Sequence, residues 1–302
     1  MLLPRRTTML GRCLREPPMS TTKEKKGDCP LCQEKDQVLL RSHLIPDSFT
    51  ASLTKKGTKQ QQAYLLDQAA IARSARPGGI YQEHFLCGEC ERRLGVWDDY
   101  TGGVFFRDVD AWKPVRNPSI WTMDHGEPEE LRGWQLDVDV DKLLLFFYSF
   151  LWRAHATDRK EFAAFDLAEH AEHFRQVSLT GTLPAESPLE IVLIRYERSE
   201  RLPGIETAWS FSDAGLLDGR HGYAFDFGGW RAFLKIDGRP FSPVLQQGTV
   251  RIGRPLFALS LPFDGSRADQ QLRQAAKDIA QAESERSVRN ASTRLERVTK
   301  MS

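Results

Sequence analysis

The two stretches Cys29-Pro-Leu-Cys32 and Cys87-Gly-Glu-Cys90 decide how this sequence is expected to fold. Each stretch separates two thiols by two residues, a spacing that lets the amides of a tight turn point at the sulfurs. Two such pairs are typical of a closed four-thiolate zinc site, because structural Zn(II) takes four tetrahedral ligands. A redox pair is the alternative interpretation, but one redox motif does not account for two pairs. We therefore expect a structural zinc held by Cys29, Cys32, Cys87 and Cys90.

The rest of the chain has the length and composition of an ordinary globular protein. It has 302 residues, of which 40% are hydrophobic and 27% charged, which excludes a wholly disordered chain. Its net charge of +1 excludes a general polyanion binder, so any nucleic-acid function must rest on local features. The longest apolar run, Leu143 to Trp152, is shorter than the roughly 20 residues of a bilayer span. Without an export signal, we expect a cytoplasmic protein that does not interact with a membrane.

Changes in composition divide the chain into five segments. Positions 33 to 86, between the cysteine pairs, form a longer excursion than a simple zinc ribbon has. Basic residues and prolines fill the start of the chain, and a polar stretch ends it. The expected segments are a disordered leader (1–26), a zinc-binding domain (27–110), a connector and helical segment (111–187), a β-rich domain (188–263) and a polar C-terminal helix or tail (264–302).

Hydrophobic periodicity predicts the elements within these segments and an α+β fold class. In the zinc-binding domain we expect strands at 37–42 and 62–67 and helices at 47–53 and 91–100. An extended connector at 111–135, with several Pro and Trp residues, should lead to a helix capped by Asp139 or Asp141 and ending near Ala156. A second helix is expected at 161–176. Alternating apolar runs then predict a small antiparallel sheet from strands at 189–196, 207–212, 223–227, 230–236 and 256–261.

One motif between the cysteine pairs carries a resemblance to a known family. The chain reads Ser42-His43-Leu44-Ile45-Pro46, then Gly78-Gly79 and Gln82, and then Leu86-Cys87-Gly-Glu-Cys90-Glu91. Over about 70 residues this order resembles the HNH, or ββα-metal, endonucleases of the treble-clef type. The resemblance implies a zinc-stapled treble clef as the N-terminal module.

The resemblance also implies roles for individual residues. His43 stands where the family has the general base that activates water, and Gln82 stands near the Asn that orients this base. Ser42 and Glu91 stand where the family holds a catalytic Mg(II) or Mn(II) ion, which offsets charge on the scissile phosphate. Ser42 departs from the pattern because the family has Asp or His there, whereas Glu91 keeps a hard oxygen ligand.

The chain is also similar to a bacterial and phage group that reads Cys-x-x-Cys, Ser-His-Ile-Ile-Pro and Leu-Cys-x-x-Cys-Glu, followed by an aromatic–acidic pair. Trp97-Asp98 fits that last element. This similarity extends to about residue 180 and supports the fold more than the reaction. By analogy, restriction or phage defence would suit such a nuclease.

Each of these residues also has a plainer interpretation. His43 could cap a turn, and Glu91 could simply favour the N-terminal end of a helix. Asp98 and Asp99 could supply the ligand missing at Ser42, although a solvated helix face is the simpler expectation. The further candidates carry weaker signals: His84 as a surface residue, His170 and His173 on a polar helix face, and Trp152 and Arg153 as packing residues.

The sequence thus leaves two main hypotheses of function. The first is a metal-dependent HNH-like endonuclease that acts on DNA, with structural Zn(II) and catalytic Mg(II) or Mn(II). The second is a catalytically impaired zinc module that binds nucleic acid or protein. A purely structural role for the zinc is a third hypothesis. Ser42 discriminates among them, because a carboxylate that reaches His43 and Glu91 from elsewhere would favour the enzyme, whereas an empty apolar pocket beside His43 would favour the binding module.

Overall fold

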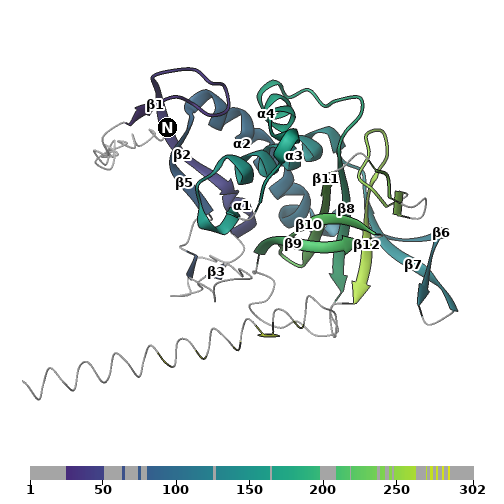
Figure 1. Cartoon of the computed structure of the whole chain (residues 1–302). Helices are drawn as coiled ribbons and strands as arrows, with labels where there is room; N and C mark the ends of the chain where they lie inside the picture. Colours follow the sequence, from purple (N-terminus) through teal and green to yellow (C-terminus); the bar gives the residue numbers. More distant parts are fainter. Residues whose placement is uncertain are drawn as a thin grey trace, which may run out of the picture.

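The N-terminal part of the chain forms a small antiparallel sheet followed by a helix (Figure 1). The computed structural model describes residues 25–50, 63–64, 74–75, 80–124, 127–163, 165–197, 209–217, 219–236, 239–241, 245–246, 248–262 and six residues between 270 and 285. The expected leader therefore lies almost wholly outside the described residues. The elements of this part are β1 (Lys26–Gly27), β2 (Gln37–Ile45), α1 (Asp47–Thr50), β3 (Ala63–Tyr64), β4 (Ser74–Ala75), β5 (Ile80–Cys87) and α2 (Gly88–Gly102).

These elements make a ββα unit, in which β2 pairs antiparallel with β5 and α2 follows directly. The expected strand at 37–42 and helix at 91–100 are confirmed, each with wider bounds. The helix expected at 47–53 is described as the single turn of α1, and the strand expected at 62–67 as the two residues of β3. Gly102 allows α1 to approach α2, because a Cβ there would lie 2.3 Å from Oγ of Ser48.

A seven-stranded sheet forms the other half of the molecule (Figure 1). Its strands lie in the order β6-β7-β12-β8-β11-β10-β9. All five strands expected between 188 and 263 are present. The strands are β6 (Lys113–Asp124), β7 (Glu127–Leu136), β8 (Leu189–Glu197), β9 (Trp209–Leu217), β10 (Arg220–Phe227), β11 (Trp230–Ile236) and β12 (Leu256–Pro262).

Two sequence predictions about this sheet were wrong. The stretch 111–135 is no connector, because β6 and β7 form a hairpin whose second strand pairs with β12. Pro114 and Pro118 made a strand at β6 difficult to predict from the sequence. An edge strand nevertheless tolerates proline, because one side of it needs no ladder hydrogen bonds. The sheet is also not purely antiparallel, since β12 runs parallel to β8.

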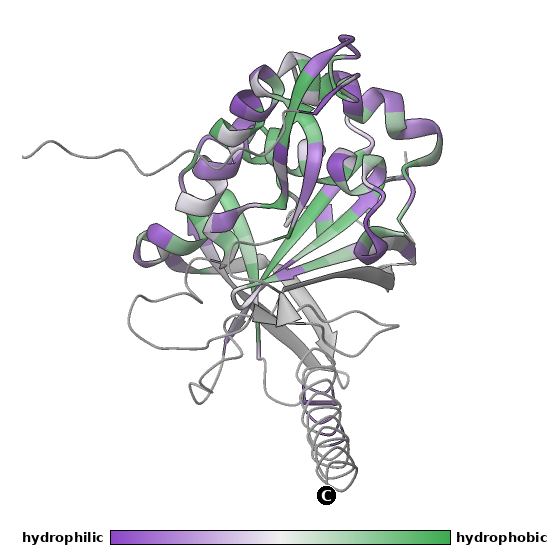
Figure 2. Cartoon of the chain, turned by 90° about the vertical axis from the view of Figure 1, so that its left-hand side faces the viewer, coloured by the Kyte–Doolittle hydropathy of each residue, from purple (hydrophilic) through white to green (hydrophobic). Residues whose placement is uncertain are grey.

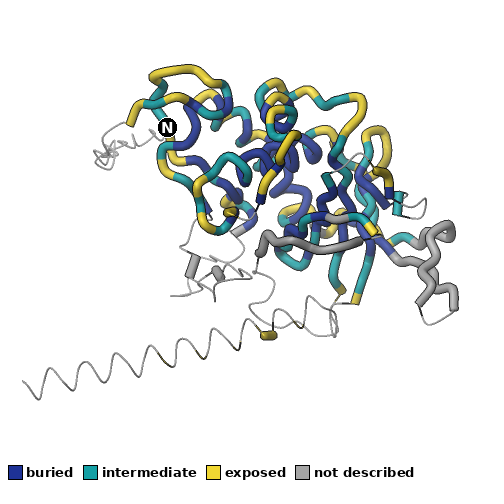
Figure 3. The backbone as a smooth tube through the Cα atoms, viewed as in Figure 1, coloured by how far each residue is buried: buried dark blue, intermediate teal, exposed yellow. Residues whose placement is uncertain are grey.

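Helix α3 (Val140–Ala156) lies between the ββα unit and the sheet (Figures 1 and 3). It begins where the sequence predicts, with Oδ1 of the N-cap Asp139 accepting a hydrogen bond from the amide of Lys142. Its residues from Leu143 to Ala154 are all buried. A helix that is apolar all round is suited to contacts on every side. In Figure 2 the central strands of the larger sheet are likewise mainly hydrophobic.

The second helix differs from its expected extent of 161–176. It consists of two 3-10 turns, Lys160–Phe162 and Ala168–His170, and then α4 (Ala171–Thr180). Ala168 has a φ of 46°, which interrupts a right-handed helix. The apolar spacing at Phe162 and Phe165 therefore reflects burial of separate turns rather than one continuous helix.

One continuous core joins the ββα unit, α3 and one face of the large sheet. Phe49 of α1 contacts the other two parts of this core. The centre of its ring lies 5.4 Å from the ring centre of Phe146 on α3. The same ring lies 5.8 Å from that of Phe225 and 5.1 Å from that of Phe227, both on β10. The turn after β2 is thus held by side chains from the opposite half of the molecule.

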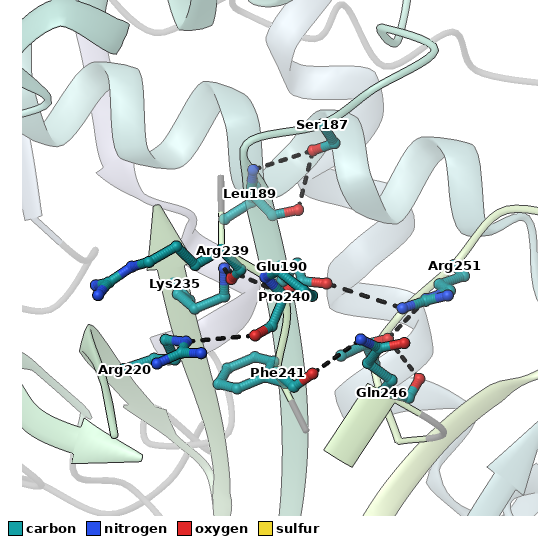
Figure 4. Close-up of polar contacts among 11 residues, drawn as sticks. Ser187, Leu189, Glu190, Arg220, Lys235, Arg239, Pro240, Phe241, Gln246 and Arg251 are labelled. Atoms are coloured by element: carbon teal, nitrogen blue, oxygen red, sulfur yellow. Dashed lines mark hydrogen bonds and ion pairs between the residues drawn. The ribbon is translucent and has the colours of Figure 1, made fainter. Parts of the chain in front are cut away.

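The other face of the sheet carries a smaller core and a buried charge. Nζ of Lys235, which is 1% exposed, lies 3.0 Å from Oε2 of Glu190 and donates to the backbone oxygen of Arg239 (Figure 4). Arg251 lies on the far side of Glu190, at 3.8 Å. Since Lys235 and Glu190 are cross-strand partners, their ion pair ties β11 to β8.

Candidate functional site

The four predicted cysteines come together at the end of the ββα unit. Their sulfur atoms all lie within 4.8 Å of one another, and Sγ of Cys32 is 3.8 Å from Sγ of Cys87. That distance is far longer than a disulfide bond, and all four residues are free cysteines. It matches the separation of about 3.8 Å between sulfurs in a tetrahedron with Zn–S bonds of about 2.3 Å. The cluster can therefore hold a metal ion, as a structural zinc site requires.

The four clustered thiols influence one another's ionisation. Hydrogen bonding from Cys90 and from the amides of Cys32, Cys87 and Leu31 lowers the pKa of the Cys29 thiol to about 4, although burial opposes this. Burial is the largest cause that raises the pKa of Cys32. The pKa of Cys90 rises because it hydrogen-bonds to Cys29 and is buried. A bound zinc ion would favour the thiolate form of all four cysteines, because its positive charge stabilises neighbouring thiolates.

Helix α4 supports the first cysteine turn from outside. Nη1 of Arg175, a largely buried residue, donates a hydrogen bond to the backbone oxygen of Leu31. Glu172 holds the same guanidinium, with its Oε1 2.7 Å from Nη2. This ion pair keeps the pKa of Glu172 low, at about 2. A cation beside a four-thiolate zinc site would offset part of the site's net negative charge.

The Ser42 hydroxyl does not face an open cation site, as the sequence suggested, but is hydrogen-bonded inside the protein. It is fully buried, and its Oγ accepts a hydrogen bond from the amide of Leu86 at 3.2 Å. That amide is available because β5 bulges, with register slipping between Leu40 and Ser42 and His84 adopting a φ of 55°. The hydroxyl therefore completes the strand pairing at an interruption of the ladder. This role explains a serine where the family pattern has a metal ligand.

Gln82 lies opposite Ser42 rather than His43 in the β2–β5 pair. Its Oε1 accepts a hydrogen bond from Oγ1 of Thr157, at the end of α3. His43 pairs with Tyr81 instead, and neighbouring residues of a strand face opposite sides. The role implied for Gln82, orienting the base, thus does not fit its position; the amide links β5 to α3.

His43 has a carboxylate partner that the sequence analysis did not identify. Its Nε2 lies 3.0 Å from Oδ1 of Asp47, in the first turn of α1. The contact has the distance of an ion pair, although the geometry is not that of an aligned hydrogen bond. Nε2 is buried while the side chain keeps 22% exposure, so solvent reaches the side chain at atoms other than Nε2. A histidine that is close to a carboxylate and partly exposed can exchange a proton with water.

A buried arginine fixes the backbone of His43. Nη1 of Arg153 donates to the backbone oxygen of His43 at 2.6 Å, and the guanidinium binds both carboxylate oxygens of Asp98 at 2.7 and 2.9 Å. Arg153 is 1% exposed and Asp98 13% exposed. The expectation of a solvated face was therefore wrong for Asp98, and this carboxylate cannot replace the ligand missing at Ser42. The contact links α3, α2 and β2 at one point.

Glu91 is half-buried in α2, directly after Cys90 of the cysteine cluster. It precedes Asp98 by seven residues, so the two side chains lie along one stripe of the helix. Gly95 lies between them, and a Cβ on it would meet nothing within 4 Å. Asp99, by contrast, is exposed. Glu91 is thus a half-buried carboxylate next in sequence to the cysteine cluster.

A second metal site is not assembled by the side chains described. Among them, the four cysteines form the sole group of three or more His, Cys, Asp or Glu residues placed to hold a metal ion. His84 lies in the β5 bulge, with Nδ1 3.4 Å from the backbone oxygen of Leu39. His173 packs its ring against Tyr148, and His170 is the N-cap of α4. A catalytic cation would have to be completed by water or substrate.

Comparison of the chain with models of protein families, with curated proteins and with solved structures found no match. In the part of the chain that the structure describes, no helix combines the length and the hydrophobicity needed to cross a bilayer. The residues of the site and their contacts are therefore the basis for assigning a function.

Proposed function

We propose that this protein is a metal-dependent HNH-like endonuclease that hydrolyses phosphodiester bonds in DNA, with His43 as the general base. The observation that carries the proposal is the contact between Nε2 of His43 and the Asp47 carboxylate. The negative charge of Asp47, 3.0 Å from Nε2, favours a proton on that nitrogen, and Nδ1 would then be the atom that accepts a proton from water. In this scheme Asp47 is a positioning residue.

The surroundings of His43 support this role. Its backbone is fixed by the buried Arg153, and α1 is fixed by the burial of Phe49 among the aromatic rings of α3 and β10. A base held by rigid elements on both sides is suited to catalysis. The ββα order of β2, β5 and α2 and the four-cysteine cluster are the features expected of a zinc-stapled treble clef.

Glu91 is the residue that would hold the catalytic cation. Mg(II) is usually bound through one or two carboxylates, with water and substrate phosphate completing its octahedral shell. The single half-buried carboxylate of Glu91 on α2 is compatible with this pattern, even though the Ser42 hydroxyl is engaged with Leu86. In this proposal the substrate phosphate supplies the ligands that the protein lacks.

A cleavage assay tests the proposal. Zinc-loaded protein should nick or cut supercoiled plasmid when Mg(II) or Mn(II) is added, and should not do so without the added ion. His43→Ala should lower the rate about 100-fold or more, since general-base catalysis contributes at least that much. Asp47→Asn should lower it about fivefold, the equivalent of an exposed ion pair of about 1 kcal/mol.

The zinc content and thermal unfolding of both variants serve as controls, because neither residue belongs to the cysteine cluster. Wild-type protein that cuts no nucleic acid with either ion, or a His43→Ala variant that cuts at the wild-type rate, contradicts the proposal. In that case the second function, a zinc module that binds nucleic acid or protein without cleaving, is the better one. The buried Ser42 hydroxyl, in place of an acidic ligand, is the observation that favours it.

A further inference from the structure

Three side chains, Arg41, His43 and Tyr81, gather on one face of the paired strands β2 and β5. These two strands lie on the opposite side of the molecule from β6 and β7 (Figure 1). The guanidinium carbon of Arg41 lies 4.6 Å from the centre of the Tyr81 ring. The His43 ring meets the same tyrosine edge-on, with 6.3 Å between ring centres. The Tyr81 ring thus contacts both the guanidinium of Arg41 and the imidazole of His43.

Arg41 differs from the other arginines near this site. Arg153 is buried with Asp98, and Arg159, which donates to the backbone oxygen of Tyr81, is paired with Glu161 at 2.5 Å. Arg41 is exposed, and among the described residues no carboxylate lies within ion-pair distance of it. Its contact with Tyr81 leaves the five N–H donors of its guanidinium available.

We propose that Arg41 binds a phosphate group of a nucleic acid, and that Tyr81 holds the guanidinium beside His43. A planar guanidinium binds a phosphate through two parallel N–H donors, and an aromatic face restrains it without using those donors. Arg41 and His43 are two residues apart on β2, so a phosphate held by one lies within reach of the other. This inference rests on the proposed function, because it assigns the phosphate-binding residue of that site.

Arg41 takes no part in proton transfer in this scheme. It stabilises the negative charge of the bound phosphodiester, while His43 accepts the proton of water. Removal of Arg41 should therefore weaken substrate binding more than it changes the ionisation of the base.

A binding experiment tests the inference apart from cleavage. The probe is a fluorescein-labelled DNA duplex, and the protein is the full zinc-loaded chain carrying His43→Asn, so that the DNA stays intact. Fluorescence anisotropy between 50 and 200 mM salt gives the affinity and its salt dependence. Adding Arg41→Met should weaken binding about tenfold and reduce the slope of log K against log salt by about one phosphate contact.

Matched variants separate the charge from its geometry. Arg41→Lys should keep most of the salt slope and still bind several-fold more weakly, because an ammonium lacks the two-pronged donor geometry. Tyr81→Leu should weaken binding, since it frees the guanidinium, whereas Tyr81→Phe should not. Lys35→Met removes one positive charge from an exposed residue before β2, and should change affinity less than twofold.

The outcomes distinguish this inference from the proposed function. If Arg41→Met matches its parent in affinity and salt slope, the inference is wrong, whether or not the wild-type protein cleaves. If wild-type protein cleaves no DNA while binding depends on Arg41 as described, the inference stands and the nuclease proposal fails. If the His43→Asn protein does not bind the duplex at all, the inference is overturned.

Discussion

The ββα unit and the seven-stranded sheet achieve their stability in different ways. The sheet buries aromatic residues against α3, as in the contact between Phe150 and Phe225, whose ring centres are 4.4 Å apart. The ββα unit has a three-stranded sheet with one two-residue strand, and holds together through a cysteine cluster and through contacts from α3 and α4. A small unit buries too little apolar surface to be stable alone, so metal and cross-links supply the difference. The candidate active residues lie in the region that depends most on its neighbours.

The two regions also differ in how they hold their buried ion pairs, Arg153–Asp98 and Lys235–Glu190. Arg153 on α3 binds two elements of the ββα unit, β2 and α2, whereas Lys235 links neighbouring strands of one sheet. Asp98 depends on Arg153, while Glu190 has both Lys235 and Arg251 close by. Four substitutions sharpen the comparison, in order of decreasing effect.

Cys87→Ala should have the largest effect, because it removes one of the four metal ligands. Structural zinc sites contribute on the order of 10 kcal/mol to folding, so we expect the ββα unit to unfold. Zinc analysis should fall from about one ion per chain to well below that. Amide hydrogen exchange should increase across Ile80–Gly102 while β8 and β11 stay protected. Cys13→Ala is the control, and a Cys87→Ala protein with unchanged zinc content would contradict the site.

Arg153→Met should come next, with a loss of about 3–5 kcal/mol in the free energy of unfolding. It leaves the Asp98 carboxylate largely buried without its cation and frees the backbone oxygen of His43. Denaturant unfolding measures the loss. The double variant Arg153→Met with Asp98→Leu should recover part of it, since it removes the isolated charge. A double variant no more stable than Arg153→Met would show that the lost contact to His43 dominates instead.

Lys235→Met should have a smaller effect, of about 2 kcal/mol, in line with the loss of hydrogen bonds to a charged group. The reason for the difference is that Glu190 remains 3.8 Å from Arg251 after the change. The same denaturant experiment applies, and zinc content should be unaffected. If Lys235→Met costs more than Arg153→Met, the contrast drawn between the two buried pairs is wrong.

Asp139→Ala should have the smallest effect, about 1 kcal/mol, through loss of the N-cap of α3. Hydrogen bonding from Lys142 is the largest cause that lowers the pKa of Asp139 below its ordinary value of 3.8. A lowered folded-state pKa stabilises the fold above the ordinary value, and this contribution disappears as pH falls through the folded pKa. The stability difference between wild type and variant should therefore be constant at neutral pH and shrink below about pH 4. A difference that grows on acidification would contradict this role.

Much of the secondary structure could be predicted from local patterns. The strands Leu189–Glu197 and Trp230–Ile236 and the helix Val140–Ala156 follow from apolar periodicity, a capping residue and turn signals. The hairpin of β6 and β7 could not be predicted in this way. Its strands are defined by pairing with each other and with β12, which is more than 100 residues away along the chain.

The candidate site was predictable in part. The spacing of the cysteine pairs identified the cluster, and the motif at Ser42-His43 identified the candidate base. Asp47 was available in the sequence four residues after His43, but the intervening Pro46 and the turn into α1 gave no sign that its carboxylate returns to the imidazole. Arg41 and Tyr81 are 40 residues apart, and only the register of β2 against β5 reveals their contact.

Local sequence patterns therefore account for the cysteine turns, for the capped helix α3 with its long apolar run, and for the alternating strands of the second half. The tertiary structure decided which polar groups face one another. It directed the Ser42 hydroxyl to the Leu86 amide, Asp98 to Arg153 and Asp47 to His43. The physical reason is that a buried polar group must find a partner, and the partners available to it are set by packing between segments far apart in the chain.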